Sequence, residues 1–371
     1  MKFFLISSKN RTVYNFRGDL VKKIVSRGYD VKVTGPDMID VDKIKDLGAE
    51  FVEVPLNKDN TSIIGDIKYC RKLYKLFKAE KPDVVLGYTV KPLVYGSIAA
   101  KLAKVKNINA FVAGTGYAFV SKTLKAKILG ILVKTLYKIG LWCCDTVIFF
   151  NPDDKEEFCK RKIVKESKCY VVGGSGVNMQ HFTPKPYPKK MTFFMLSRLL
   201  KCKGVKEYLE AADIVKKEYP ETKFYLLGKF EHDMLDAIPE DVVRDYIDRG
   251  VVELFPETND VRPYYEMSSV YVLPSYREGT PRTVLEAMAM ARPIITTDAN
   301  GCRTTVKEGV NGFLVPIENS QAIAEAMIKF IKSPELVEKM GAESLKYCAE
   351  KYDVKRVNND LIKYLKIEEE K

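Results

Sequence analysis

The feature that most constrains the fold is a regular alternation of short apolar runs with longer helical patterns. Apolar runs such as Lys2–Ser7 and Val84–Gly87 alternate with segments whose apolar residues recur at helical spacing, such as Ile63–Glu80. Strands that alternate with helices of this length form βαβ units with a parallel sheet. The first half is further expected to contain the strands Asp30–Thr34, Glu50–Val54, Ile108–Ala113, Thr146–Phe150 and Cys169–Val172 and the helices Tyr14–Ser26, Val41–Leu47 and Leu93–Ala103.

The segment Thr183–Lys190 (TPKPYPKK) interrupts this pattern with three prolines and no apolar periodicity, which is typical of a linker. The alternation then restarts, which predicts a second α/β sheet. We therefore expect two Rossmann-like domains facing a cleft, with ligands outside the carboxyl ends of the strands. The expected strands are Phe193–Ser197, Lys223–Leu227, Val251–Phe255, Val270–Pro274 and Pro293–Thr297, and the expected helices are Val205–Lys217 and Pro281–Met290.

These patterns predict four parts of the chain. Residues 1–183 form the first domain, 184–190 the linker and 191–351 the second domain. Residues 352–371 form a separate helical pattern, which we expect to pack back on the first domain.

Positive charge is concentrated in the first half of the chain. Residues 1–185 contain 33 Lys and Arg against 18 Asp and Glu, whereas residues 186–371 contain 28 against 31. The stretch 101–150 alone has eight lysines and a single acid, Asp145. Such a local excess suggests an anionic partner: nucleic acid, an anionic lipid surface or a phosphorylated substrate. Lysines that only solvate the surface are the alternative.

Several classes of protein are disfavoured by composition. No window holds 18 uncharged apolar residues, so no spanning helix is expected, and the N-terminal apolar run fits a first buried strand better than a signal peptide. The eight cysteines form no C-x-x-C pair and only two histidines occur, so a zinc site is not expected. Reduced thiols in a cytoplasmic protein are the simplest interpretation.

The most informative stretch for chemistry is Val270–Ala291 (VYVLPSYREGTPRTVLEAMAMA), an apolar strand, a Gly/Pro loop and a helix. Thr280 can cap this helix and Pro281 suits its first position. The amides and the positive end of the helix dipole can then hold a phosphate. Glu278 and Glu286 could accept hydrogen bonds from the hydroxyls of two different polyols. The alternative is a surface glutamate and a glutamate that stabilises the helix.

A second cluster, SRLLKCKGVKEY at 197–208, places two cations at the end of an expected strand. Arg198 and Lys203 could converge on a diphosphate there. In a lysine-rich chain two surface cations are common, so this cluster indicates a binding site only in combination with the glutamate pair.

Together these residues resemble the donor site of glycosyltransferase family 4. The pattern is Arg198-x4-Lys203-Gly204 followed by Glu278-Gly-Thr-Pro-x4-Glu286-Ala. The resemblance implies an α/β protein of the GT-B fold and a retaining hexosyltransferase that uses a nucleotide sugar. Within the family, the segments 88–92, 95–100 and 114–117 are most similar to bacterial enzymes that extend undecaprenyl-diphosphate-linked sugars.

The resemblance also implies roles for single residues. Arg198 and Lys203 would bind the donor diphosphate and stabilise the leaving group, and Glu278 would bind the donor sugar hydroxyls. These three would be the catalytic residues, without a protein general base and without a metal. The remaining donor contacts would be Gly279, Thr280 and Pro281 around the sugar, amides near Thr283 and Val284 at the β-phosphate, and Glu286 at the ribose.

The acceptor side is less well matched. Family members often have a Gly-Gly loop after the first strand, where this chain has Ser8–Thr12, and a histidine in the region that here reads Ala113–Tyr117. His181 is expected to be structural and His232 solvated, and Asp40-Val-Asp42 lacks the context of a metal-binding Asp-x-Asp. The acceptor-side residues implied by the resemblance are Lys91, Gly114, Thr115, Gly116 and Tyr117.

The segment Lys122–Trp142 has apolar residues at helical spacing with lysines interleaved. Basic amphipathic helices lie on anionic membranes, although a helix that covers a Rossmann core would have the same pattern. We expect a protein located in the cytoplasm and peripheral on the inner face of the cytoplasmic membrane.

The leading expectation is transfer of a hexose or N-acetylhexosamine, with N-acetylgalactosamine as first choice, from a UDP-sugar to an undecaprenyl-diphosphate-linked saccharide. This reaction would serve glycan, capsule, O-antigen or glycoprotein assembly. The alternatives are a GT-B-fold UDP-sugar epimerase or hydrolase, and a basic nucleic-acid-binding protein.

Overall fold

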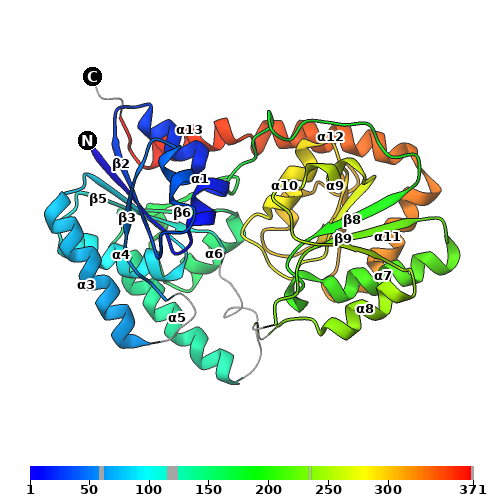
Figure 1. Cartoon of the computed structure of the whole chain (residues 1–371), viewed down its shortest axis with the longest axis horizontal. Helices are drawn as coiled ribbons and strands as arrows, with labels where there is room; N and C mark the ends of the chain where they lie inside the picture. Colours follow the sequence, from blue (N-terminus) through cyan, green and yellow to red (C-terminus); the bar gives the residue numbers. More distant parts are fainter. Residues whose placement is uncertain (58–61, 115–123, 233, 235, 369–371) are drawn as a thin grey trace. The chain divides into compact units, whose positions relative to one another are not determined.

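The chain divides into two units, and the first unit is made of two separate stretches of the chain. The computed structural model describes residues 1–57, 62–114, 124–232, 234 and 236–368. Of residues 124–130 and 132 it describes the backbone alone. The first unit consists of Met1–Ser175 together with Val354–Lys371, and the second of Gly176–Asp353. Each unit is built on its own parallel sheet (Figure 1).

The sheet of the first unit has the strand order β3-β2-β1-β4-β5-β6-β7 within the described residues, and all its pairings are parallel. Since β1 lies beside β4, the chain reverses its winding direction between these two strands. Ligands of such sheets bind outside the carboxyl ends of the strands near this point. The strands are β1 (Lys2–Ile6), β2 (Asp30–Gly35), β3 (Glu50–Glu53), β4 (Val84–Tyr88), β5 (Asn107–Val112), β6 (Thr146–Phe149) and β7 (Cys169–Val171).

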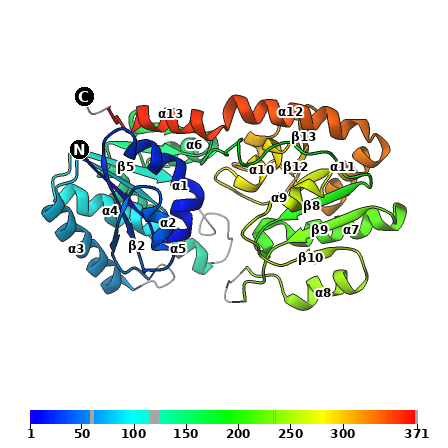
Figure 2. The ribbon, with the colours of Figure 1, turned by 45° about the horizontal axis from the view of Figure 1, so that its top comes forward.

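Helices cover both faces of this sheet because its strands are apolar on both sides. In β1, Phe3 and Leu5 join the core that packs against α1 and α13, whereas Phe4 and Ile6 join the core under α3, α4 and α5. Figures 1 and 2 show α13 beside α1. The helices are α1 (Asn10–Val25), α2 (Val41–Lys45), α3 (Ile63–Glu80), α4 (Val90–Leu102), α5 (Leu124–Trp142), α6 (Pro152–Lys160) and α13 (Val354–Tyr364).

The second unit repeats this architecture with the order β10-β9-β8-β11-β12-β13. Here β8 lies beside β11, so its reversal point lies between the two segments that carry the expected site residues. Its strands are β8 (Thr192–Leu196), β9 (Lys223–Leu227), β10 (Glu253–Phe255), β11 (Val270–Leu273), β12 (Ile294–Thr297) and β13 (Gly312–Val315). Its helices are α7 (Val205–Glu218), α8 (Glu240–Asp248), α9 (Arg262–Glu266), α10 (Arg282–Ala289), α11 (Ser320–Lys332) and α12 (Glu335–Lys351).

The proline-rich segment is part of the second unit and not a free linker between domains. Arg292, which is fully buried, donates to the carbonyl oxygens of Lys185 (3.1 Å) and Pro186 (3.2 Å). The hydroxyl of Tyr187 donates to the Ala291 carbonyl at 2.7 Å. These bonds fix the segment, so the division falls between Ser175 and Gly176, earlier than the expected end of the first domain at 183.

The end of the chain belongs to the first unit from Val354 onward. Val357 and Leu361 of α13 join the core formed with α1, and the Asn107 side chain donates to the Leu365 carbonyl at 2.7 Å. Tyr352 remains in the second unit, where its carbonyl accepts from the Val177 amide at 2.8 Å. The final segment therefore starts two residues later than the expected boundary at 352.

Every strand expected from the sequence is present, with ends shifted by at most two residues. Two helices begin earlier than expected, at Asn10 and Val90. Pro92 lies within the first turn of α4, where a missing amide hydrogen costs no helical hydrogen bond. None of the described helices combines the length and the apolar composition that a bilayer span requires.

Candidate active site in the second unit

A tight backbone approach brings the expected cationic and acidic segments together. After β8 the chain makes a short turn, Lys201–Lys203, and enters α7 through Gly204, whose φ is +73°. A Cβ atom at Gly204 would lie 2.1 Å from the Pro274 carbonyl oxygen at the end of β11. Only glycine allows this contact, and it places Lys203 directly beside the loop that follows β11.

The structure pairs Lys203 with Glu278. The Lys203 Nζ donates to Glu278 Oε1 at 2.5 Å, and the two side chains are 19% and 16% exposed. Burial acts to lower the pKa of Lys203, but the charge and hydrogen bond of Glu278 outweigh it and raise this pKa above its ordinary value. The lysine is therefore fully charged at neutral pH.

Arg198 supplies a second positive charge to the same site. Its side chain is exposed, and among the described residues no hydrogen bond or ion pair engages its guanidinium. Its charge acts to lower the pKa of Lys203, so the two cations lie within electrostatic range of each other. Two cations and one carboxylate therefore lie in this region, which leaves a net positive charge for an anionic ligand.

The loop that carries Glu278 is held from behind by the turn after β12. The Glu278 amide donates to the Asn300 carbonyl at 3.0 Å. Gly301 has a φ of +78°, and a Cβ atom there would lie 2.2 Å from the Glu278 carbonyl oxygen. On the other side, the Ser275 hydroxyl and the Tyr276 amide both donate to the Cys202 carbonyl, at 3.1 and 2.9 Å. The loop position is therefore determined by backbone contacts.

Glu286 lies on α10 with its carboxylate already held in place. Arg282 donates to Glu286 Oε1 at 3.0 Å, and the Tyr265 hydroxyl donates to Oε2 at 3.1 Å. Tyr265 Oη also lies 2.9 Å from the Thr283 carbonyl. Burial raises the pKa of Glu286 above its ordinary value, although Arg282 and Tyr265 act in the opposite direction. The Arg282 Nη1 also donates to the Gly176 carbonyl at 2.7 Å.

The start of α10 differs from the expectation. The N-cap residue is Pro281, and its side chain cannot accept a hydrogen bond. Thr280, the expected cap, donates its hydroxyl to the Gly279 carbonyl at 3.0 Å. The Val284 amide donates to the Pro281 carbonyl at 3.1 Å, so it is engaged within the helix. The side chain of Thr283 is half-buried beside these residues, and Gly279, Pro281 and Val284 are buried.

Tyr265 and Tyr276 are part of the site although the sequence does not indicate them. Tyr276 Oη lies 2.6 Å from Glu207 Oε1, which ties the loop to α7, and Tyr265 orients Glu286. No local pattern marks either tyrosine, because their partners lie 69 and 21 positions away in the chain.

The expected acceptor residues lie in the first unit, and the structure describes two of them. Lys91 lines a cavity of about 680 Å³ at the carboxyl ends of β1, β2 and β3. Its Nζ donates to Asp66 Oδ1 at 2.8 Å and to the Asn57 carbonyl at 3.0 Å. Gly114 follows β5 with a φ of +117° and does not line this cavity. Thr115, Gly116 and Tyr117 lie outside the described residues.

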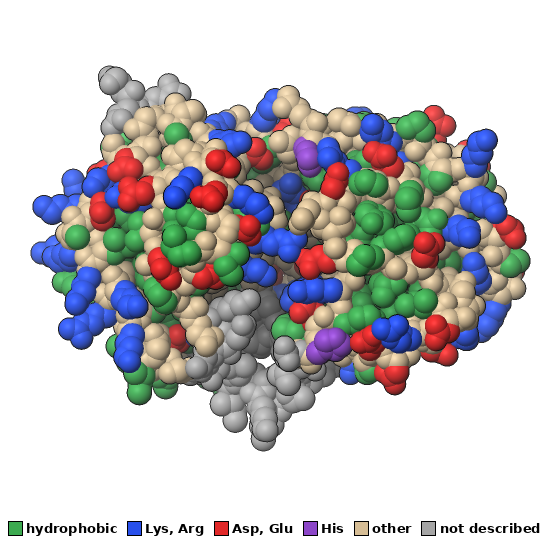
Figure 3. All heavy atoms as spheres, viewed as in Figure 1, with side chains coloured by type: hydrophobic (Ala, Val, Ile, Leu, Met, Phe, Trp, Pro, Cys, Tyr) green, Lys and Arg blue, Asp and Glu red, His purple; other side chains and the backbone are tan. Residues whose placement is uncertain are grey.

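The cavity that Lys91 lines is basic and has an apolar border. Its lining includes three further lysines, Lys9, Lys68 and Lys72. Beside it, the first turn of α3 presents Ile63 and Ile64, which are 73% and 69% exposed. Figure 3 shows lysine and arginine side chains gathered along the edge of the first unit that α3 forms.

The remaining residues singled out in the sequence contact neighbours within their own unit. His181 packs edge-on against Phe182, with 5.0 Å between ring centroids, and His232 is exposed, 3.8 Å from Glu240. Asp40 is paired with Lys43 at 2.9 Å and accepts from the Tyr14 hydroxyl.

The expected basic helix is present as α5, and it covers the core. Tyr137 and Leu141 are buried, whereas Ile131, Ile139 and Trp142 are exposed. Both interpretations of the segment therefore retain support, since one face packs inward and large apolar side chains face outward. Lys122 lies outside the described residues.

Comparison with known proteins decides the family. Residues 178–369 match the family model described as glycosyl transferases group 1, and residues 3–151 match glycosyl transferase 4-like. The chain belongs to the glycosyltransferases. The two Rossmann-like units and the expected GT-B fold are confirmed, because this glycosyltransferase superposes on solved structures of that fold.

Relatives with curated names cover most of this glycosyltransferase. It is 26% identical over 350 residues to the N,N'-diacetylbacillosaminyl-diphospho-undecaprenol alpha-1,3-N-acetylgalactosaminyltransferase of Campylobacter jejuni, with 91% of each chain covered. It is 28% identical over 290 residues to the UDP-Gal:alpha-D-GlcNAc-diphosphoundecaprenol alpha-1,3-galactosyltransferase of Escherichia coli, with 74% and 73% covered.

Among solved structures, Anabaena Alr3699/HepE in complex with UDP superposes with a TM-score of 0.80 at 16% identity, with 99% of this chain and 100% of that chain covered. A glycosyltransferase from Rickettsia africae superposes with a TM-score of 0.79 at 16% identity, with 98% and 97% covered. At this identity the similarity establishes the fold.

Proposed function

We propose that this glycosyltransferase moves a hexose or N-acetylhexosamine, with N-acetylgalactosamine as first choice, from a UDP-sugar to an undecaprenyl-diphosphate-linked saccharide with retention of configuration. The observation that carries the proposal is the pairing of Lys203 with Glu278 near the reversal point of the second sheet, with Arg198 within electrostatic range and Glu286 on the adjoining helix. The names of the relatives support the lipid-linked acceptor, and the UDP complexes of similar structures support the donor.

The chemistry needs few protein groups. When the sugar–phosphate bond breaks, positive charge develops on the sugar and additional negative charge on the diphosphate. Arg198 and Lys203 are fixed cations that stabilise the leaving diphosphate, and no metal ion is required for that role. The departing phosphate helps to deprotonate the acceptor hydroxyl, so we assign no general base to the protein.

Donor binding must change the partners of Lys203. Glu278 holds Lys203 at 2.5 Å, and Arg198 is exposed. We infer that the diphosphate first meets Arg198 and then takes Lys203 from Glu278. The released carboxylate can then accept hydrogen bonds from the donor sugar hydroxyls, while Glu286 accepts from the ribose. The ion pair between Lys203 and Glu278 would therefore be broken when the donor is bound.

On the acceptor side, we propose that the basic cavity lined by Lys91 takes the anionic part of the acceptor. Lys9, Lys68 and Lys72 add to its positive charge, and the exposed Ile63, next in the chain to the lining residue Ser62, offers apolar surface to a polyprenyl chain. The residues 114–117 are proposed to complete this side. Such a substrate resides in a bilayer, so we propose a peripheral location on the inner face of the cytoplasmic membrane, with α5 contacting the anionic surface.

The test is a donor screen with site variants. UDP-, GDP- and ADP-sugars are offered, and release of free nucleotide is measured with and without a polyprenyl-diphosphate-linked acceptor. We expect turnover with UDP-sugars, and a loss of about 10- to 100-fold in Arg198→Ala and Glu278→Ala, because each removes a charge-assisted hydrogen bond of roughly 1.5–3 kcal/mol.

Matched controls are Arg244→Ala and Glu350→Ala, whose side chains are exposed in the same unit. They should keep full turnover. Unchanged turnover in both site variants, or a preference for GDP- or ADP-sugars, would contradict the proposal. Nucleotide release that does not depend on any acceptor would instead indicate a hydrolase.

A further inference from the structure

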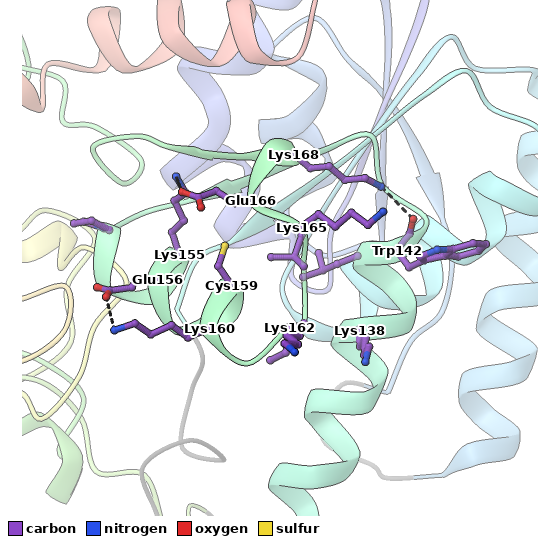
Figure 4. Close-up of a pocket in the computed structure, with 14 residues that line it drawn as sticks. Lys138, Trp142, Lys155, Glu156, Cys159, Lys160, Lys162, Lys165, Glu166 and Lys168 are labelled. Atoms are coloured by element: carbon purple, nitrogen blue, oxygen red, sulfur yellow. Dashed lines mark hydrogen bonds and ion pairs between the residues drawn. The ribbon is translucent and has the colours of Figure 1, made fainter.

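A second cavity in the first unit has no role in the proposed reaction. Its volume is about 1010 Å³, and it lies between the end of α5, the helix α6 and the segment that leads into β7 (Figure 4). Trp142 precedes β6 and Lys168 precedes β7, so one end of this cavity lies at the amino edge of the sheet, and Pro152 at the start of α6 lines its other end. The Lys91 cavity lies at the carboxyl ends of other strands, β1, β2 and β3. The two cavities share no lining residue.

The cavity combines apolar walls with a cationic border. Leu141, Ile163 and Val164 contribute apolar surface, and Leu141 and Ile163 belong to the buried core behind it. The charged lining residues are six lysines and two glutamates: Lys138, Lys155, Lys160, Lys162, Lys165, Lys168, Glu156 and Glu166.

Half of these lysines already have partners. Lys155 pairs with Glu166 at 3.1 Å, and Lys160 pairs with Glu156 at 2.5 Å, so both acids of the lining are neutralised. Lys168 donates to the carbonyl oxygen of Cys144 at 2.6 Å.

The other three cations are available to a ligand. Lys138, Lys162 and Lys165 are exposed, and no hydrogen bond or ion pair engages their ammonium groups within the part of the chain that the structure describes. They come from α5 and from the segment after α6, so they approach the cavity from two sides (Figure 4). This arrangement fits a ligand that carries negative charge over an apolar body.

The only tryptophan of the chain lies at the edge of this cavity. Trp142 ends α5 and is 72% exposed, and Ile139 on the same helix is also exposed. A solvated indole next to free lysines is unusual in a surface that contacts only water, because tryptophan prefers the boundary between apolar and aqueous phases.

We propose that this cavity binds an anionic phospholipid at the bilayer surface, with the lipid phosphate between Lys138, Lys162 and Lys165 and the indole of Trp142 among the headgroups. The proposal rests on the peripheral membrane contact proposed above and assigns it to a defined site, separate from donor and acceptor. Nucleic acid fits less well, because the walls are aliphatic and a single aromatic side chain offers no series of stacking surfaces.

The lone tryptophan makes the test direct, because all indole emission comes from this site. The full-length protein is titrated at low salt with vesicles of phosphatidylcholine alone or mixed with phosphatidylglycerol. We expect a blue shift of the emission with the anionic vesicles only, quenching by bromine-labelled acyl chains, and reversal by high salt. An equal shift with neutral vesicles, or no shift with either, would overturn the proposal.

A charge variant locates the contact. Lys138→Gln/Lys162→Gln/Lys165→Gln should weaken vesicle binding on the order of 100-fold, since each cation near an anionic surface contributes about 1 kcal/mol. The control Lys189→Gln/Lys339→Gln/Lys346→Gln removes the same charge from exposed positions of the second unit and should bind as the natural chain does. Equal losses in both triple variants would reduce the effect to net charge and overturn the assignment.

Failure of this proposal is distinguishable from failure of the proposed reaction. Glu278→Ala should abolish most transfer and leave the tryptophan response to vesicles unchanged. A protein that transfers sugar but shows no indole shift refutes only the lipid site. Binding of single-stranded RNA with the same indole shift and the same dependence on the three lysines would assign the cavity to nucleic acid instead.

Discussion

Replacing Gly301 by alanine tests the backbone contact that positions Glu278. The alanine would have to adopt a φ near +78°, and its Cβ would lie 2.2 Å from the Glu278 carbonyl oxygen and 2.5 Å from that of Gly279. The left-handed conformation costs a non-glycine residue about 1–2 kcal/mol. Relief of the clash requires backbone movement, which adds about 1–3 kcal/mol.

We therefore expect Gly301→Ala to lose about 3 kcal/mol of stability, which corresponds to roughly 6–12 °C in the melting temperature of a unit of this size. Thermal unfolding followed by circular dichroism measures this loss. Calorimetric titration with UDP measures the site, and we expect at least tenfold weaker binding, because the loop that carries Glu278 must move away from the turn.

Gly250→Ala is the matched control. Gly250 has a similar φ of +67°, but a Cβ atom there would meet nothing within 4 Å. This variant should lose only the conformational cost of about 1–2 kcal/mol and keep its UDP affinity. If the two variants melt at the same temperature and bind UDP equally, the close approach at Gly301 does not position the site.

Two further predictions concern buried charges of the second unit. Because burial raises the pKa of Glu286, the stability that its protonation provides is present below pH 4.5 and lost as the pH rises through the folded-state pKa. The stability of Glu286→Gln relative to the natural chain should therefore increase from pH 5 to pH 8 in urea unfolding, and parallel profiles would exclude this effect. Arg292→Met should lose at least about 3 kcal/mol, because the buried Tyr265 carbonyl and the carbonyl groups of Lys185 and Pro186 lose their donor. Arg244→Met, at an exposed ion pair, should change stability by less than about 1 kcal/mol. Similar urea midpoints for these two variants would show that Arg292 does not fix the proline-rich segment.

The sequence was sufficient for the architecture because the strands of a doubly covered sheet are continuous apolar runs. The sequence was less informative at Arg292, because no local pattern indicates that this residue is buried. Its hydrogen bonds hold the expected linker against the second unit. Other features are visible in the sequence itself. Asn319 caps α11 by accepting from the Ala322 amide, and the apolar spacing of Ser320–Lys332 is regular, yet neither α11 nor α12 was expected.

For the site, the spacing of residues indicated which side chains converge but not how they pair. Lys203 and Glu278 both appeared as ligand-binding groups, and their 2.5 Å contact with each other follows only from the fold. The cap of α10 was assigned to Thr280 because threonine is a good cap. The chain instead enters the helix at Pro281, with the threonine hydroxyl turned to Gly279.

The placement of α13 has a consequence for biosynthesis. The second unit is one continuous stretch of chain, so it can fold as soon as Asp353 has left the ribosome. The first unit, although translated earlier, awaits Val357, Leu361 and Leu365, which fill its core beside α1. The portion made first is thus completed after the second unit, and until α13 has emerged its nascent surface presents an apolar groove that chaperones can recognise.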